Sequence, residues 1–157
     1  MSGPHRTVRR KAVATWLALT TGVFGTHRFY LHGPRDRWAW LFPLPTLLGL
    51  EGVERMNQLG QDDRLAWLLI PLLGLSLVAA LLSGIVYGLT PDERWNARFN
   101  PVEPAPPSGW AAVIGVVLCL LIGGAALMAT LAFSAQRYFE AQADDAASTQ
   151  NSRRLTQ

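Results

Sequence analysis

The chain has 157 residues, of which half are hydrophobic, and a formal net charge of +3 at pH 7. The apolar residues gather in blocks instead of recurring with an amphipathic period, which argues against a soluble globular core. The basic residues form no continuous stripe, so the composition argues against a nucleic-acid-binding protein. The only cysteine, Cys119, lies inside an apolar block, which leaves no intrachain disulfide and no Cys/His zinc spacing.

The first seven residues are predicted to form a short cytoplasmic segment. Four basic residues precede an apolar stretch, an order that imitates a signal peptide, but no A-x-A-like cleavage site follows; they are Arg6, Arg9, Arg10 and Lys11. We therefore expect the stretch over residues 8–25 to be retained as a first transmembrane helix. It is short for a membrane crossing.

This first apolar stretch ends in a compact polar and aromatic block. Arginine, histidine and aromatic side chains are tolerated at the membrane interface, and two glycines supply the freedom for a tight reversal. The pattern predicts a turn at the membrane edge, with its charged pair acting as an anchor and not as a reactive group. Its residues are Gly22, Gly25, His27, Arg28, Phe29, Tyr30 and Leu31.

These residues give the chain a family resemblance. The block resembles the TM-two domain, two transmembrane helices joined by a short linker with the signature G-x-x-G-x-[H/D]-R-F-Y-L-G, and the resemblance covers roughly residues 8–58. Two features depart from it: His32 precedes Gly33 where the signature has glycine directly, and prolines interrupt the second helix. The resemblance implies topology and no chemistry. Some eukaryotic members with Asp-Arg-Phe are likened to signalling receptors, and His27 replaces that acid here.

The second apolar block, residues 38–50, is too short to cross alone and contains Pro43 and Pro45. It either crosses as a broken helix, which the helix pairing of the family favours, or dips into the membrane and returns. Beyond it, Glu51 and Arg55 have the i,i+4 spacing of a helical ion pair.

The third apolar block, residues 65–90, contains no charged side chain in its apolar part and is long enough to cross. Small residues recur on it every four positions, which predicts a packing groove. Contact with another helix of the same chain and contact with a second copy both remain open. The groove residues are Ser76, Ala80, Gly84 and Gly88.

The remaining chain is predicted to contain a surface helix, a linker and a fourth span. Thr90 provides a hydroxyl cap just before residues 91–108, within which Trp95 and Phe99 share one apolar face and a proline-rich linker follows. Residues 109–140 contain a fourth transmembrane helix, and residues 141–157 are expected to be disordered because they are polar. No long internal repeat is evident.

These elements predict an all-α integral membrane protein with four transmembrane helices, the second broken by proline, and an interfacial helix between the third and fourth. Both termini are predicted in the cytoplasm of a bacterial-type inner membrane, because nine basic residues then fall on that side and five on the other.

For function, the leading hypothesis is an interaction, scaffold or assembly component whose partners are the lipid bilayer and either another membrane protein or a second copy. A small transporter or channel subunit is the alternative, and a membrane enzyme ranks third. We expect no nucleic acid, no cofactor and no metal, although His27, His32 and Asp36 lie close enough in sequence to be weighed as ligands.

Overall fold

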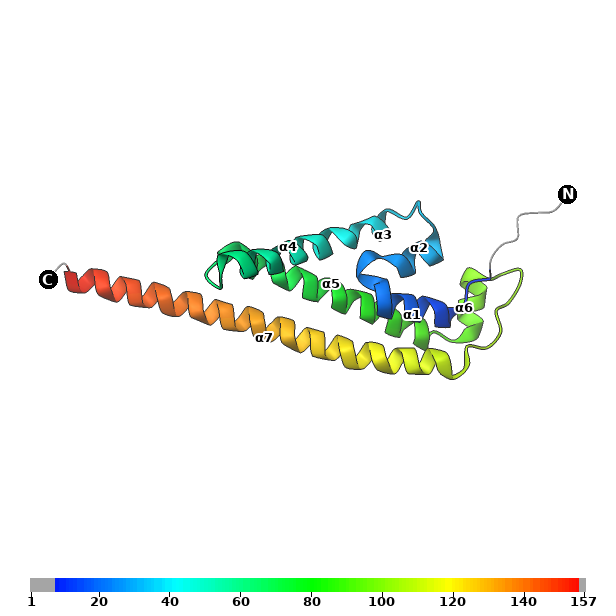
Figure 1. Ribbon diagram of the computed structural model, residues 1–157. Coiled ribbons are helices and arrows are strands. Elements are labelled where there is room, and N and C mark those ends of the chain that lie inside the picture. The colour runs from blue at the N-terminus through cyan, green and yellow to red at the C-terminus, as the bar shows by residue number, and fades with distance from the viewer. Residues whose placement is uncertain (1–7, 156–157) are drawn as a thin grey trace.

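The computed structural model describes residues 8–155, which form helices and contain no strand (Figure 1). This confirms the all-α prediction. The elements are α1 (Lys11–Thr21), the 3-10 helix η1 (Gly22–Phe24), α2 (Thr26–His32), α3 (Arg37–Leu41), α4 (Pro43–Leu59), α5 (Arg64–Leu89), α6 (Asp92–Phe99) and α7 (Gly109–Leu155).

Helices α5 and α7 form the antiparallel centre of the bundle. A Cβ atom built on Gly84 would lie 2.8 Å from the Cys119 sulfur, and one on Gly123 would lie 3.3 Å from the Leu81 Cβ atom. The backbones approach this closely because glycine faces the neighbouring helix. By length and hydropathy, α5 and α7 are the two helices among the described residues that qualify to span a membrane. Four spans are not found by this criterion.

The first apolar stretch does not form one crossing helix. Helix α1 has 11 residues, or about 16 Å at 1.5 Å per residue, roughly half of a 30 Å hydrocarbon core. The chain then reverses, because α2 runs back along α1: the Tyr30 hydroxyl accepts a hydrogen bond from the Arg10 amide at 3.0 Å, and Leu31 packs in one cluster with Ala14. The stretch over residues 8–25 thus forms an apolar helix, Lys11–Phe24, which is shorter than the length required for a candidate span, and the chain turns back after it.

The proline-containing block continues in one direction to the other end of the bundle (Figure 1). Phe42, between α3 and α4, keeps right-handed helical backbone angles, so Pro43 and Pro45 interrupt the hydrogen bonds without reversing the chain. Helix α4 then packs antiparallel to α5 through its glycines, since a Cβ on Gly52 would lie 2.6 Å from the Leu69 Cβ atom. The block over residues 38–50 is therefore broken between α3 and α4 but keeps one direction.

Helix α6 closes the end of the bundle at which α1 begins. Its Trp95 is buried and packs with Phe99 against Tyr87 of α5, so the apolar face expected to lie on a membrane surface packs on protein. The expected hydroxyl cap is also wrong, because Thr90 ends α5 and its hydroxyl donates to the Val86 carbonyl at 2.6 Å.

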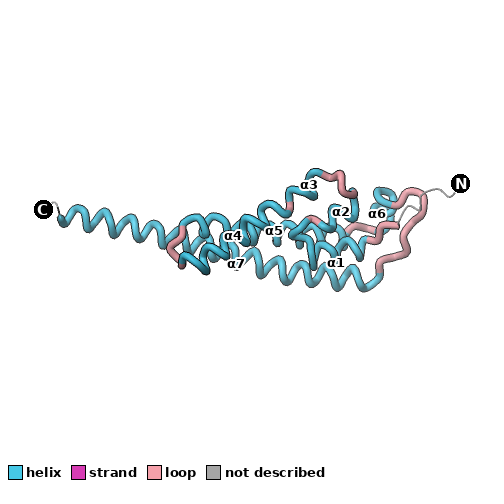
Figure 2. Tube along the Cα trace, turned by 45° about the horizontal axis from the view of Figure 1, so that its top comes forward, coloured by secondary structure: helices cyan, strands magenta, loops and turns pink. Residues whose placement is uncertain are grey.

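Helix α7 continues far beyond its apolar half. Figures 1 and 2 show its C-terminal part projecting past the turn between α4 and α5. The expected disordered tail is wrong for residues 141–155, which remain helical, while residues 156 and 157 lie outside the described part. Alanine-rich composition and pairs such as Gln142 with the Tyr138 hydroxyl at i,i+4 favour the helix despite its polarity.

Candidate functional site

The two motif glycines form the reversal itself, which lies against α5 at Ala80 and not at the end of that helix. Gly25 adopts a left-handed φ of 74°, and a Cβ there would lie 2.5 Å from the Ala39 carbonyl oxygen. A Cβ on Gly22 would lie 2.8 Å from the Ala80 Cβ atom of α5. The glycines are therefore needed where η1 turns against its neighbours, and the expected membrane-edge turn is displaced into the bundle.

His27 is fully buried next to this reversal. Its ring packs edge-on against Phe42 at 5.2 Å between centroids and lies 5.8 Å from the Tyr87 ring. Within the described residues, neither of its ring nitrogens has a hydrogen-bond partner. His27 therefore lies in the interior of the bundle and not on its surface.

Arg28 is a structural anchor, but through an ion pair. Its ε-nitrogen donates to Asp36 at 3.0 Å, and the other carboxylate oxygen of Asp36 caps α3 by accepting from the Trp38 amide at 3.1 Å. Burial alone would raise the pKa of Asp36, but the Arg28 hydrogen bond and charge and the Trp38 amide bring that pKa below its ordinary value. The charged pair thus fixes the turn between α2 and α3.

A second turn repeats this geometry at the opposite end of the bundle. Arg55 donates through its ε-nitrogen to Asp63 at 2.7 Å, and Asp63 caps α5 by accepting from the Leu65 amide at 3.1 Å. The Arg55 hydrogen bond is the main cause that lowers the pKa of Asp63. The i,i+4 spacing of Glu51 and Arg55 had indicated an ion pair between them. Arg55 instead pairs with Asp63.

The two turns also share their glycine and tryptophan geometry. Gly33 and Gly60 end the preceding helices with φ of 80° and 90°. The indole of Trp40 donates to the Pro34 carbonyl at 3.0 Å, and the indole of Trp67 donates to the Gln61 carbonyl at 2.6 Å. Both turns thus have the same set of contacts at the same spacing.

This correspondence exposes an internal repeat that sequence reasoning missed. The pattern G-x-x-G-x-x-R-x4-G-x-x-D-R-x-A-W-L begins at Gly22 and recurs 27 residues later at Gly49. The repeated alanines, Ala39 and Ala66, are both fully buried. Comparing the sequence with itself at an offset of 27 residues would have revealed this repeat. The arginine and aspartate present in both units would then have indicated an ion pair in each.

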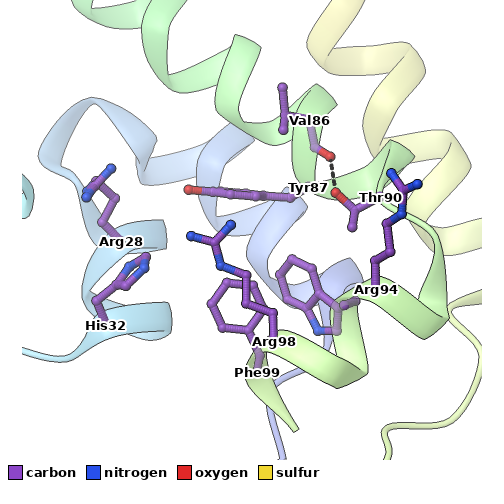
Figure 3. A pocket seen from close by; sticks show the side chains of 9 residues that line it. Arg28, His32, Val86, Tyr87, Thr90, Arg94, Arg98 and Phe99 are labelled. Atoms are coloured by element: carbon purple, nitrogen blue, oxygen red, sulfur yellow. Dashed lines mark hydrogen bonds between the residues drawn. The ribbon is translucent and has the colours of Figure 1, made fainter. Parts of the chain in front are cut away.

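The first turn differs from the second by the cavity beside it. A cavity of about 190 Å³ lies between α2, the end of α5 and α6, and no acidic residue of the described chain lines it. Figure 3 shows the side chains of Arg28, His32 and Arg98 gathered on one side of the cavity, with the Tyr87 hydroxyl pointing toward Arg28 and Arg94 apart beside Thr90. Its lining comprises Arg28, His32, Val86, Tyr87, Thr90, Arg94, Trp95, Arg98 and Phe99.

The start of the described chain holds α6 against the bundle. The Arg9 carbonyl accepts from the Trp95 indole at 2.7 Å, and the Arg9 amide donates to Asn100 at 2.8 Å. Lys11 pairs with Asp92 at 2.8 Å, and this pairing is the main cause that lowers the pKa of Asp92. These contacts fix the α6 wall of the cavity.

The predicted small-residue groove lies inside the chain. Gly84 faces Cys119 of α7 and Ala18 of α1, while a Cβ on Gly88 would clash with Val116. Ser76 and Ala80 are buried on the same helix. The groove is thus used for intramolecular packing of α5 with α1 and α7.

The weighed metal ligands do not form a site. His32 lies 3.8 Å from Asp36, whereas His27 packs into the aromatic cluster, and no group of three metal-ligating side chains occurs within residues 8–155.

Searches for similar proteins found no matching family model, curated protein or solved structure.

Proposed function

We propose that the chain is a multi-pass membrane protein that acts by interaction with a partner. The membrane location is supported by the apolar lengths of α5 and α7 and by large side chains on their outer faces, such as Leu82 at 57% and Leu121 at 64% exposure. Side chains of this kind in continuous helical faces fit a hydrocarbon environment. The TM-two signature supports membership in that family, with its glycines used for the α1–η1–α2 reversal.

The helix directions support three crossings and a re-entrant hairpin. Helices α3 and α4 together, α5 and α7 each reach from one end of the bundle to the other, whereas α1 and α2 stay in one half (Figure 1). The N- and C-terminal ends of the described chain then lie on opposite sides of the membrane. Both termini on one side, as the sequence predicted, would require a fourth crossing.

One observation carries the interaction function: α7 extends as a bare helix beyond the bundle. The guanidinium of Arg137 lies over the Trp67 ring at 5.1 Å, and the helix then continues to Leu155. Residues 138–155 add about 27 Å at 1.5 Å per residue. A rigid arm of this length contributes little to the packing of its own chain, which supports a role in contacting another protein.

Co-purification from native membranes tests this role. We expect a stoichiometric partner with the full chain and its loss when the chain is truncated after Glu140, which keeps the Arg137 to Glu140 ion pair intact. The truncated protein must retain its thermal stability in detergent. Equal recovery of the partner with both proteins, or no stoichiometric partner with either, would contradict the proposal.

A second candidate, transport of a small ion or proton, is favoured by His27 alone. Ionisable residues within membrane bundles are costly and mark transport pathways, and this one is buried without a hydrogen-bond partner among the described residues. Purified protein in liposomes should then give an ion or proton flux that His27→Gln abolishes and His32→Gln leaves intact. Absence of flux from the wild-type protein would eliminate this candidate.

A further inference from the structure

We propose that the cavity between α2, α5 and α6 binds a phosphoryl oxyanion, supplied by an anionic lipid headgroup or by a free phosphate compound. The free-phosphate form does not depend on the proposed membrane function, whereas the lipid form does. The two forms are separated by the experiment below.

The charge of the cavity favours an anion. Arg28 is neutralised in part by Asp36, but within the described residues neither Arg94 nor Arg98 forms an ion pair, and no carboxylate lines the cavity. Arg98 lies 5.4 Å from the centroid of its neighbour Phe99, a contact that leaves its donors available. A guanidinium presents its donors as a planar fork that matches phosphate oxygens.

The arrangement of donors points to one small group. Arg28, His32 and Arg98 gather on one side with the Tyr87 hydroxyl (Figure 3). The volume of about 190 Å³ is below the roughly 300–1,000 Å³ of pockets that enclose whole small molecules, so the cavity suits a single charged group. Basic pockets between membrane helices bind lipid phosphates in this way.

The internal repeat supports a specialised site. The second turn keeps the arginine, aspartate, glycine and tryptophan contacts of the first, yet Leu59 stands where the first has His32. Arg94 and Arg98 belong to α6, which lies at the same end of the bundle as the first turn and far from the second. The contacts common to both turns therefore suffice to build such a turn without His32, Arg94 and Arg98, and these additional cations beside Arg28 require another explanation.

Phosphate titration in neutral detergent is the first arm. We expect inorganic phosphate to raise the melting temperature of the full chain, and Arg98→Gln to weaken the apparent affinity by about tenfold or more, since a charge-assisted hydrogen bond is lost. Arg37→Gln is the matched control because Arg37 is exposed at the same end of the bundle and outside the cavity. An equal loss with Arg37→Gln would indicate bulk charge and overturn the proposal.

Lipid binding is the second arm. Nanodiscs of phosphatidylcholine with or without phosphatidylglycerol are compared for retained lipid and for melting temperature. Phosphatidylglycerol binding that Arg98→Gln reduces, without a response to free phosphate, supports the lipid form; a phosphate response alone supports the free form. No response in either arm overturns the proposal.

The twin turn controls for folding. Arg28→Gln and Arg55→Gln break corresponding ion pairs, so comparable losses of stability are expected. Only Arg28→Gln should also lower the affinity for inorganic phosphate or phosphatidylglycerol. Loss of affinity in both would trace the effect to folding and contradict the site.

Discussion

At the scale of single residues, Gly25 and Gly33 share a positive φ but differ in their surroundings. A Cβ on Gly25 would lie 2.5 Å from the Ala39 carbonyl oxygen, whereas one on Gly33 would have nothing within 4 Å. Gly33→Ala should then cost about 1–3 kcal/mol for the backbone alone, because a positive φ with a ψ of 179° is essentially confined to glycine. Gly25→Ala should cost about 1–2 kcal/mol for its left-handed backbone, and the steric clash should add about 1–3 kcal/mol.

Thermal unfolding in detergent measures this difference. Gly124→Ala is the control, because a Cβ there would also have nothing within 4 Å and the backbone is helical. A loss for Gly25→Ala no larger than the about 1–2 kcal/mol of its left-handed backbone would refute the close approach of Gly25 to α3.

The two capping aspartates predict a dependence of stability on acid. Asp36 and Asp63 have folded-state pKa values below the ordinary 3.8, so their ion pairs stabilise the protein above that pH. This stability is lost as the pH falls below 3.8 through the lowered folded values, because the carboxylates must then be protonated.

Melting temperatures of the wild type and of an Asp36→Asn/Asp63→Asn variant, measured from pH 7 to pH 2, test this. The difference between the two should be constant at neutral pH and shrink below about pH 4, where the wild-type carboxylates become neutral. A difference that does not change with pH would mean that the charge of these residues is irrelevant to the turns.

At the scale of elements, the packing of α5 on α7 makes its own prediction. A Leu side chain at position 84 would meet Cys119 and Ala18, so Gly84→Leu should destabilise the bundle by several kcal/mol, about the cost of severe overpacking. Gly124→Leu on α7 has open space and should leave the melting temperature almost unchanged. Equal effects of the two substitutions on the melting temperature would contradict the close packing of α5 at Gly84.

The sequence was sufficient to predict those helices that are specified by one continuous stretch of residues. The charge-free run over residues 65–90 predicted α5 within one residue at each end, because an apolar block of this length is typical of a single long helix. Polar composition misled for residues 141–155, where helix propensity and side-chain pairs along α7 keep the chain helical. The ion pairs of Arg28 and Arg55 span eight residues through a turn, a spacing that helical rules do not cover.

At the scale of the whole molecule, the direction of α2 could not be read from the sequence. The same residues that signal a membrane edge, two glycines followed by His27 and Arg28, also permit a reversal against α5. Which of the two occurs depends on contacts made far along the chain, such as Gly22 with Ala80 and Tyr30 with Arg10. The cavity was missed for the same reason, since α2 and α6 are separated by some sixty residues in sequence.

The three crossings that we propose can be compared with the distribution of charge. Of the basic residues in the described chain, eight then fall at the end where α1 begins and five at the other, two of which lie far along α7. The positive-inside rule places the richer end in the cytoplasm and counts distant charges little. The eight are Arg9, Arg10, Lys11, Arg28, Arg35, Arg37, Arg94 and Arg98, and the five are Arg55, Arg64, Arg137, Arg153 and Arg154.

Reporter fusions that are active only in the cytoplasm, or only outside it, test this topology. Fusions at Gly33 and Val102 should report the cytoplasm, and fusions at Gly60 and the C-terminus should report the outside. Four crossings with both termini in the cytoplasm require the reverse result at each of these points, because every loop after the first apolar stretch changes side. A cytoplasmic signal at Gly60 with an external one at Gly33 would therefore show that α1 and α2 do not form a re-entrant hairpin in the membrane.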